Sequence, residues 1–391
     1  MPALASQGDP GHTSRVSPYV DRLELLPQGA RVLVGLSGSV DSSVAAALLQ
    51  ERGFDVVCVS LHLWEPKPGD GEMEPSRCCA PSDLDDAART ADAIGVPHFT
   101  FERLAAFESH VVKPFVDAYV AGSTPSPCVA CNRDVKIGAF VALARRLGAV
   151  AFATGHYARS GSTAREGGRP ALLRAIDSGK DQSYFLHGIG TEALSMLATP
   201  LGELHKTEVR AIARRHALPN ADKPDSEDLC FTGGDHAGFV ERRAADRVRP
   251  GPIVDADGRV VGTHAGVHRF TIGQRKGVGV ALGKPAFVAA IDADTATVRL
   301  GDPGDLQARE AVVRDVAWID RAALEHGPRR VTARIRYRHA GAPATIERVI
   351  EHGTETTRVL FDTPARAVTP GQTCVFYDGD EVLGGGTLAH A

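Results

Sequence analysis

The sequence predicts an α/β protein, in which a doubly wound parallel sheet is followed by a small β-rich central domain and a C-terminal antiparallel β-barrel. Two observations predict this order. From Ala30 to about Leu218, apolar strand-like runs alternate with helical patterns, which is typical of a parallel sheet covered by helices. From about Pro219 onward, Gly, Pro and Asp become frequent and helical periodicity fades, as expected for short antiparallel strands joined by turns.

The first half of the chain supplies the elements of the parallel sheet. Apolar runs at 31–34, 56–62 and 150–154 have the length and composition of buried strands. A helix with an internal Pro114 is expected over roughly 104–121. Ligands of such sheets bind at the carboxyl ends of the strands, so residues that follow these runs are candidates for a binding site.

The second half indicates two further units. A hairpin is predicted from 287–291 and 297–300, and it is followed by strands at 331–337, 344–350, 357–361 and 373–377. The expected boundaries are a flexible leader at 1–24, the parallel-sheet domain at 25–220, the central domain at 221–285 and the barrel at 286–391.

One of these strands, 331–338, carries charge on a single face. Side chains alternate along a strand, so one side is apolar and the other presents a row of guanidinium groups. The apolar residues are Val331, Ala333, Ile335 and Tyr337, and the polar ones are Thr332, Arg334, Arg336 and Arg338. The row is either the solvated face of a sheet or a surface that binds RNA, and Arg275-Lys276 adds a second basic site in a glycine-flanked loop.

Composition excludes several classes. No apolar run is long enough to cross a bilayer, so no membrane contact is expected. Residues 1–18 lack the apolar core of a secretory signal and the Arg-rich pattern of a transit peptide, which predicts a cytoplasmic protein. The formal net charge of −4 gives no global sign of nucleic-acid binding, so any RNA contact must come from local basic patches.

The most informative segment is Gly35-Leu36-Ser37-Gly38-Ser39-Val40-Asp41-Ser42-Ser43. It follows the strand at 31–34 and leads into a helix-forming run, so small residues bring the backbone close to a helix N-terminus that favours an anion. It lacks the Gly-Lys-Ser/Thr of a Walker A loop and the order of a dinucleotide fingerprint. It resembles instead the pyrophosphate loop (PP-loop) of ATP pyrophosphatases, in the adenine nucleotide alpha hydrolase-like group. The simpler alternative is an N-capped helix whose Ser and Asp only satisfy backbone donors.

The cysteines are the second chemical signal. There are seven, an odd number without an export signal, so structural disulfides are not expected. Cys128-x-x-Cys131 follows a Pro-rich turn and opens a helix, where a thiolate is favoured, whereas Cys230 lies far along the chain in a polar loop. Structural zinc, a redox pair, sulfur transfer through a persulfide, and three cysteines holding an iron–sulfur cluster are the alternatives. An ATP-binding loop together with reactive thiols is consistent with sulfur transfer. In that reaction ATP adenylates a carbonyl oxygen, and sulfur then replaces this oxygen.

The chain is similar to the tRNA-specific 2-thiouridylases. The matching segments occur in the same order as in that family and extend over nearly the whole chain after the leader. The matching segments are 35–43, Trp64, 124–128 with 131–132, 153–157, 180–186, 225–226 with 230–231, 273–277, 336–338, 369–372 and 383–386.

The resemblance implies a tRNA-uridine 2-sulfurtransferase. It would use ATP and Mg²⁺ to adenylate the C2 oxygen of uridine 34, the wobble base of tRNA, and then transfer sulfur from a cysteine persulfide, releasing AMP and pyrophosphate. Cys131 would be the nucleophile, and Cys230 would receive the persulfide from an upstream sulfur-relay protein. The residues implied to contact ATP are Gly35, Leu36, Ser37, Gly38, Ser39, Val40, Asp41, Ser42, Leu61 and Gly155. Those implied to contact tRNA are Ser126, Pro127 and Cys128 at the target base, with Lys180, Asp181, Gln182, Arg336, Tyr337 and Gln372 elsewhere.

Two residues depart from the family pattern. Ser39 stands where many members have Gly, which should cost little if φ there is negative. Cys128 stands where many have Asp, and this puts acid–base help from that position in doubt. It strengthens the iron–sulfur alternative, with Cys128, Cys131 and Cys230 as ligands, relative to Asp-bearing members, but the persulfide route is still preferred because three cysteines alone do not prove a cluster. Two other hypotheses are a PP-loop ligase or amidotransferase with a non-RNA substrate, and a non-catalytic nucleotide-binding protein with an RNA-binding barrel.

Overall fold

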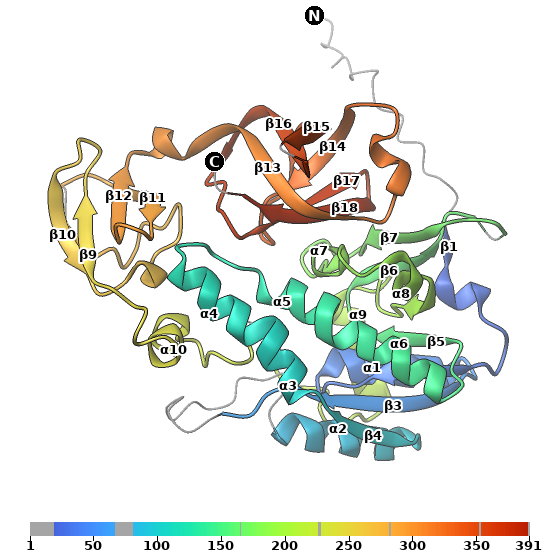
Figure 1. The fold of residues 1–391 in the computed structure, drawn as a ribbon. Helices are drawn as coiled ribbons and strands as arrows, with labels where there is room; N and C mark the ends of the chain where they lie inside the picture. The colour runs from blue at the N-terminus through green and yellow to red at the C-terminus, as the bar shows by residue number, and fades with distance from the viewer. Residues whose placement is uncertain are drawn as a thin grey trace, which may run out of the picture.

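The protein is built from three sheets, shown in Figure 1, a computed structural model that describes residues 19–66, 81–164, 166–225, 228–280, 283–351 and 353–389. The leader expected before residue 19, and Cys78 and Cys79, lie outside the described residues. Among the described residues, no helix is both long and apolar enough to span a membrane.

The first sheet is parallel and has the strand order β4-β3-β2-β5-β8. The order reverses direction between β2 and β5, which places the topological switch point of a doubly wound sheet at their carboxyl ends. The strands are β2 (Arg31–Gly35), β3 (Asp55–His62), β4 (His98–Glu102), β5 (Ala151–Thr154) and β8 (Leu197–Ala198).

Helices cover both faces of this sheet, because its strands alternate apolar side chains between two cores. Val32 and Val34 pack with α1 and α9 on one face, whereas Leu33 packs with α4 and α6 on the other. The predicted doubly wound α/β domain is therefore confirmed. The helices are α1 (Val40–Glu51), α2 (Pro81–Ile94), α3 (Leu104–Phe107), α4 (Lys113–Val120), α5 (Pro127–Ala130), α6 (Ile137–Arg146), α7 (Ser183–Leu186), α8 (Thr191–Met196), α9 (Lys206–Arg215) and α10 (His236–Arg243).

Two of these helical runs contain a π-helical turn. One spans Glu108–Val112 and lies directly before Pro114, and its wider turn accommodates a proline that cannot donate a backbone hydrogen bond. The helix predicted over 104–121 is thus present, with this irregularity inside it. The other π-helical turn, Cys131–Lys136, begins at one of the candidate cysteines and joins α5 to α6.

The second sheet has the order β10-β9-β12-β11, with its own small apolar core. The hairpin predicted at 287–300 is confirmed, but it pairs with β9 and not with the barrel strands. The change of sheet therefore falls after Gly301, and the boundary expected at 286 does not coincide with it. The strands are β9 (Gly251–Val254), β10 (Val260–His264), β11 (Phe287–Asp292) and β12 (Thr297–Gly301).

The third sheet closes into the predicted antiparallel barrel, because β18 pairs with both β13 and β17. Strands from the first half extend it: β18 pairs with β7, and β1 and β6 follow. Since β1 and the short 3₁₀ helix Arg22–Leu25 are structured, the expected flexible leader does not reach residue 24. The strands are β1 (Val20–Asp21), β6 (Ala158–Ser162), β7 (Pro170–Arg174), β13 (Gln307–Trp318), β14 (Arg329–Arg334), β15 (Ala342–Glu351), β16 (Thr354–Arg366), β17 (Thr373–Asp378) and β18 (Glu381–Leu388).

Candidate functional site

The segment 36–39 connects β2 to α1 at the switch point of the parallel sheet. Gly38 has φ +72°, and a Cβ there would lie 2.2 Å from the backbone oxygen of Asp83, so only glycine fits. Ser39 has φ −87°, which any L-residue adopts. The condition under which serine was expected to cost little at this position, a negative φ, is therefore met.

Three serine hydroxyls close the loop on itself at the start of α1. The Oγ atoms of Ser37, Ser39 and Ser42 lie 2.9–3.3 Å from one another, and the backbone N–H of Ser37 donates to Ser42 Oγ. The first N–H groups of a helix have no intrahelical acceptor and carry partial positive charge. Hydroxyl and N–H donors gathered in this way are suited to a phosphate group.

The other residues expected at ATP support this loop through close packing. A Cβ on Gly35 would lie 2.6 Å from the Phe140 ring, and one on Gly155 would lie 2.5 Å from the backbone nitrogen of Ser42. Leu36 and Val40 are each 2% exposed, and Leu61 is buried in β3. The structure thus brings 35–42 and Gly155 together, whereas Leu61 lies on the neighbouring strand.

Asp41, in the first turn of α1, is held by groups from two distant segments. Lys206 Nζ lies 2.7 Å from Asp41 Oδ1 and 2.9 Å from Oδ2, and the Tyr157 hydroxyl donates to Oδ1 at 2.9 Å. Burial and the neighbouring carboxylate raise the pKa of Tyr157, so its hydroxyl remains a donor.

Lys206 also forms an ion pair with a second carboxylate, that of Asp225. Asp225 accepts from Lys180 at 2.7 Å, from Lys206 at 2.8 Å and from Arg210 at 2.9 Å. Burial alone would raise the pKa of Asp225, but hydrogen bonds from Lys180 and Lys206 outweigh it and lower the pKa to about 2. This carboxylate is therefore charged at any physiological pH.

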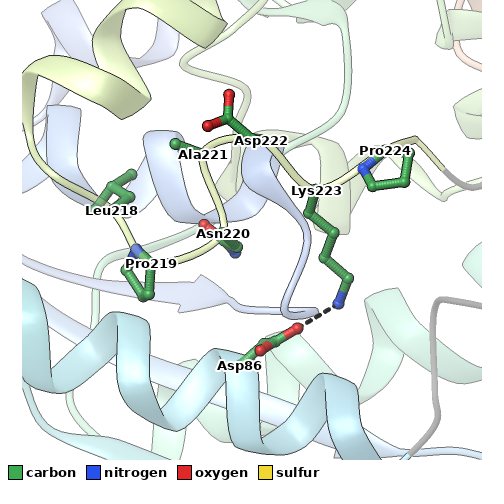
Figure 2. A pocket seen from close by; sticks show the side chains of 8 residues that line it. All are labelled: Asp86, Leu218, Pro219, Asn220, Ala221, Asp222, Lys223 and Pro224. Carbon is green, nitrogen blue, oxygen red and sulfur yellow. Dashed lines mark hydrogen bonds and ion pairs between the residues drawn. The ribbon is translucent and has the colours of Figure 1, made fainter.

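The segment before Asp225 also fastens the loop backbone. Asn220 Nδ2 and Lys223 Nζ both donate to the backbone oxygen of Gly38, at 3.0 and 3.2 Å. Figure 2 shows Lys223 pointing to Asp86 of α2, with Lys223 Nζ 2.6 Å from Asp86 Oδ2; both side chains line a pocket of about 440 Å³. Residues 220–225 thus wrap the PP-loop from outside.

The two candidate thiols of the CxxC turn lie in different environments. Cys128 is exposed in α5, whereas Cys131 is 6% exposed and begins the π-helical turn. Pro127 occupies the first helical position, so the prediction that the CxxC motif opens a helix is confirmed.

Cys131 and Cys230 share one apolar cluster. Cys131 belongs to the buried cluster that also holds Trp64 and Phe107, and Cys230 packs against it from the edge. Phe231 inserts its ring among those of Phe115, Phe107 and Trp64, with centroids 5.0, 5.7 and 6.1 Å away. Residues about 100 positions apart in the sequence are therefore brought to one cluster.

The iron–sulfur alternative stays a prediction. Across the residues that the structure describes, which include Cys128, Cys131 and Cys230, no group of three His, Cys, Asp or Glu side chains is placed to hold a metal ion. The remaining described cysteines, Cys58 and Cys374, are fully buried in strands, and burial raises the pKa of the Cys58 thiol to about 12.

The turn before Cys128 is held by the barrel. Gln372 Nε2 donates to the backbone oxygens of Thr124 and Pro125, at 3.0 and 3.3 Å, and Thr373 N donates to Ser126 Oγ at 3.3 Å. Thr124 N donates to the Pro370 oxygen, and its hydroxyl meets that of Thr271 in the central unit. The structure therefore brings Gln372, Ser126, Pro127 and Cys128 together.

The expected tRNA residues at 180–182 are engaged inside the protein. Asp181 is 3% exposed and accepts from the backbone N–H of Ala175 and Ser183 and from Arg334. Gln182 pairs with the backbone of Tyr157, while Lys180 is partly exposed and meets Asp225. A tRNA contact for these residues stays a prediction.

The predicted row of guanidinium groups on 331–338 is wrong, because β14 ends at Arg334. That arginine is 8% exposed and lies 2.8 Å from Asp181, where a buried carboxylate needs a cation. Arg336 and Tyr337 follow in a turn; Arg336 donates to the Arg366 oxygen, and the Tyr337 ring packs on Phe185 at 4.5 Å. Their expected role at tRNA stays a prediction.

Four residues that the geometry places at the site were given no role from the sequence: Lys206, Arg210, Asn220 and Asp225. Lys206 had a detectable signal, since it begins a helix shortly after strand β8 in a parallel sheet. His156, at the carboxyl end of β5, hydrogen-bonds Thr154; burial and Lys136 lower its pKa to about 3, so it is neutral.

A doubly wound sheet, an anion-suited loop at its switch point and an appended barrel define a PP-loop protein with additional domains. Three family models match the chain: "tRNA methyl transferase HUP domain" at residues 30–234, "tRNA methyl transferase PRC-barrel domain" at 237–302 and "Aminomethyltransferase beta-barrel domain" at 308–388. The tRNA-specific 2-thiouridylase MnmA of Sorangium cellulosum is 54% identical over 93% of this chain and 93% of its own length. That of Moorella thermoacetica is 46% identical over 91% and 98%. The chain belongs to the tRNA-specific 2-thiouridylase family.

Solved structures are more distant. A 4-thiouridine synthetase in a complex with RNA and bound ATP is 16% identical, with a TM-score of 0.32 over 57% of this chain and 53% of its own. The NMN synthetase of Francisella tularensis is 19% identical, with a TM-score of 0.31 over 51% and 67%. Likeness at this level carries no argument about function.

Proposed function

We propose that this protein is an ATP-dependent tRNA sulfurtransferase that converts uridine 34 to 2-thiouridine. The observation that carries the proposal is the shared cluster of Cys131 and Cys230, in a chain whose PP-loop offers a phosphate site and whose relatives are 2-thiouridylases. Cytoplasmic tRNA would be the substrate, and a persulfide-bearing relay protein would supply the sulfur.

The first step is adenylation. The C2 oxygen of the uracil attacks the α-phosphorus of ATP, the bond between the α- and β-phosphates breaks, and pyrophosphate leaves. The Ser37, Ser39 and Ser42 hydroxyls and the N-terminus of α1 would hold the phosphates. Mg²⁺ would arrive with ATP and neutralise phosphate charge.

The second step is sulfur transfer. The terminal sulfur of a Cys230 persulfide attacks C2, and AMP leaves. The Cys131 thiolate then attacks Cys230 Sγ, which releases the thiocarbonyl base and forms a Cys131–Cys230 disulfide. An external thiol reductant returns both residues to thiols.

Mass spectrometry of nucleosides tests this proposal. Unmodified tRNA is incubated with the protein, ATP, Mg²⁺ and a persulfide source, and digested. We expect 2-thiouridine with the wild type, and none with Cys131→Ser or Cys230→Ser. Unchanged uridine with the wild type would contradict the proposal, and a methylated base would favour the activity named in the family models.

The same variants separate the alternatives. A PP-loop ligase or amidotransferase needs no thiol, so full turnover in both serine variants would support that class. A non-catalytic protein would release no pyrophosphate on addition of tRNA. An iron–sulfur route requires near-stoichiometric iron after anaerobic purification that is lost in Cys128→Ala; iron-free protein with full activity excludes it.

A further inference from the structure

The turn between β14 and β15 carries three neighbouring residues that include two expected at tRNA. β14 ends at Arg334, and residues 335–341 connect it to β15. Arg336 and Tyr337 are partly exposed in this turn, and Arg338 is exposed. A connection of this length has many accessible conformations, so its geometry depends on contacts that hold the backbone.

Arg334 bonds two backbone carbonyl groups of this turn. Its Nε donates to the oxygen of His339 at 3.0 Å, and its Nη2 donates to the oxygen of Tyr337. A guanidinium presents its N–H donors in a fixed plane, so two oxygens that bind it are held in a set arrangement. The buried Arg334 side chain therefore fixes the backbone of the turn at two points.

The third nitrogen of Arg334 reaches a distant segment, 175–183. Nη1 donates to Asp181 Oδ2 at 2.8 Å, and Asp181 Oδ1 accepts from the backbone N–H groups of Ala175 and Ser183, at 3.2 Å each. The Asp181 side chain is 3% exposed and that of Arg334 is 10% exposed. A charge-assisted hydrogen bond between two such buried groups is short and directional, so it fixes the two segments relative to each other.

Aromatic rings surround this ion pair. The guanidinium carbon of Arg334 lies 5.7, 5.8 and 6.0 Å from the ring centroids of Tyr184, Tyr377 and Tyr337. The Tyr337 ring also packs on Phe185, with centroids 4.5 Å apart. The rings attract the cation and keep water from it, which strengthens its bonds to the turn and to the carboxylate.

The ion pair joins two segments that both carry exposed cations. Lys180 directly precedes Asp181, and its side chain is 41% exposed. On the other segment, Arg338 follows Arg334 by four positions and is exposed. Cations held in a fixed arrangement are suited to the phosphate groups of a nucleic acid, because phosphate contacts set the register and orientation of the complex.

We propose that Arg334 is a positioning residue that holds the turn 335–341 and the segment 180–182 together as one surface for the phosphate backbone of tRNA. The choice of tRNA rests on the proposed function, whereas the hold on the turn does not. Arg334 is itself buried and bonded to protein acceptors, so it acts through the exposed cations that it brings together.

The hold on the turn is tested by trypsin cleavage after Arg338 in the full-length, ligand-free protein, followed by peptide mass spectrometry. Arg334→Lys keeps a cation for Asp181 but lacks the planar fork that bonds both carbonyl groups as well. We expect cleavage after Arg338 to become about tenfold faster, because local opening of the turn then costs less. Arg330→Lys, in an exposed ion pair on the same strand, should leave the rate at the wild-type value.

Cleavage after Arg358, within a strand that is paired on both sides, reports whether each variant is folded. A wild-type rate after Arg338 in folded Arg334→Lys would overturn the proposal. If Arg334→Lys does not fold, Asp181→Asn weakens the same contact from its other end and should raise the rate about threefold. A wild-type rate in that variant would likewise overturn the proposal.

The role toward tRNA is tested by the salt dependence of tRNA binding, measured by fluorescence anisotropy. A positioning residue changes the affinity but not the number of phosphate contacts. Arg334→Lys should therefore raise the Kd about tenfold and leave the slope of log K against log salt at the wild-type value. Arg338→Ala, which removes a direct contact, should lower that slope by about one. Arg330→Lys should change neither quantity.

Three results would contradict the proposed role. A slope that falls by about one in Arg334→Lys would make Arg334 a direct phosphate contact. An unchanged Kd despite faster cleavage would separate the turn from tRNA binding, and an unchanged slope in Arg338→Ala would show that this surface does not meet phosphate. Neither assay forms 2-thiouridine, and the first contains no tRNA, so failure here is distinguishable from failure of the proposed function.

Discussion

The PP-loop and the turn that carries Cys128 and Cys131 are held in place in opposite ways. The hydroxyls of Ser37, Ser39 and Ser42 bond one another across at most five positions of the sequence. The turn is fastened by Gln372 and Thr373, which lie 247–248 positions away. A motif whose contacts are local is visible in the sequence, whereas a turn whose geometry depends on another domain is not.

The largest expected effect comes from removing a contact between segments that are far apart in the chain. Arg334→Met leaves the buried Asp181 carboxylate without its cation, which should cost about 3–5 kcal/mol of unfolding free energy. Urea unfolding measures this. Arg330→Met, on the same strand with an exposed ion pair to Asp362, should cost less than about 1 kcal/mol. Equal losses of unfolding free energy in the two variants would show that the buried Asp181–Arg334 ion pair contributes no more to stability than an exposed one.

The Gly38→Ala substitution disturbs the local backbone geometry of the PP-loop. A Cβ at φ +72° and 2.2 Å from a backbone oxygen forces the loop to move, so we expect tRNA-dependent pyrophosphate release to fall about 100-fold. Gly29→Ala, a control outside the loop with φ +71° and no atom within 4 Å of the added Cβ, should change it by less than about twofold. The comparison fails if both variants behave alike.

A smaller effect should follow from Gln372→Ala, which removes two hydrogen bonds to the turn before Cys128. We expect a loss of about 1–2 kcal/mol in stability and faster alkylation of Cys128 without any tRNA present. Gln307→Ala, at an exposed position of the same barrel, is the control. If Gln372→Ala weakens tRNA binding but leaves Cys128 labelling unchanged, Gln372 acts only through tRNA.

The smallest effect is a pH dependence of stability. The pKa of Asp225 falls from its usual value of 3.8 to about 2 in the folded protein, so its stabilising contribution is present above about pH 4 and is lost as the pH falls toward 2. The difference in unfolding free energy between wild type and Asp225→Asn should therefore be constant from pH 7 to 5 and shrink below pH 4. A difference that grows as the pH falls would contradict the assignment.

Much of the fold followed from the sequence, because periodic apolar runs and turn residues act locally. Strands β2, β3 and β5 of the parallel sheet, the hairpin at 287–301 and the barrel strands β14, β15, β16 and β17 were predicted to within about five residues, whereas β4, β8, β13 and β18 were not predicted. The sheet to which the hairpin belongs was not, since strand pairing between β12 and β9 depends on chain folding over more than 40 positions. The ion pair of Arg334, at the end of β14, with Asp181 was likewise not predicted, because the two residues are 153 positions apart.

The sequence by itself determined the PP-loop, the harmless Ser39 and the choice of Cys131 and Cys230 as candidate thiols, because each depends on residue type and local conformation. Only the tertiary structure decided that Cys131 and Cys230 share one cluster, that Gln372 holds the cysteine turn, and that Asp225 joins Lys180 to Lys206. Contacts of this kind are set by burial and charge between segments far apart in the chain, and no spacing along the sequence records them.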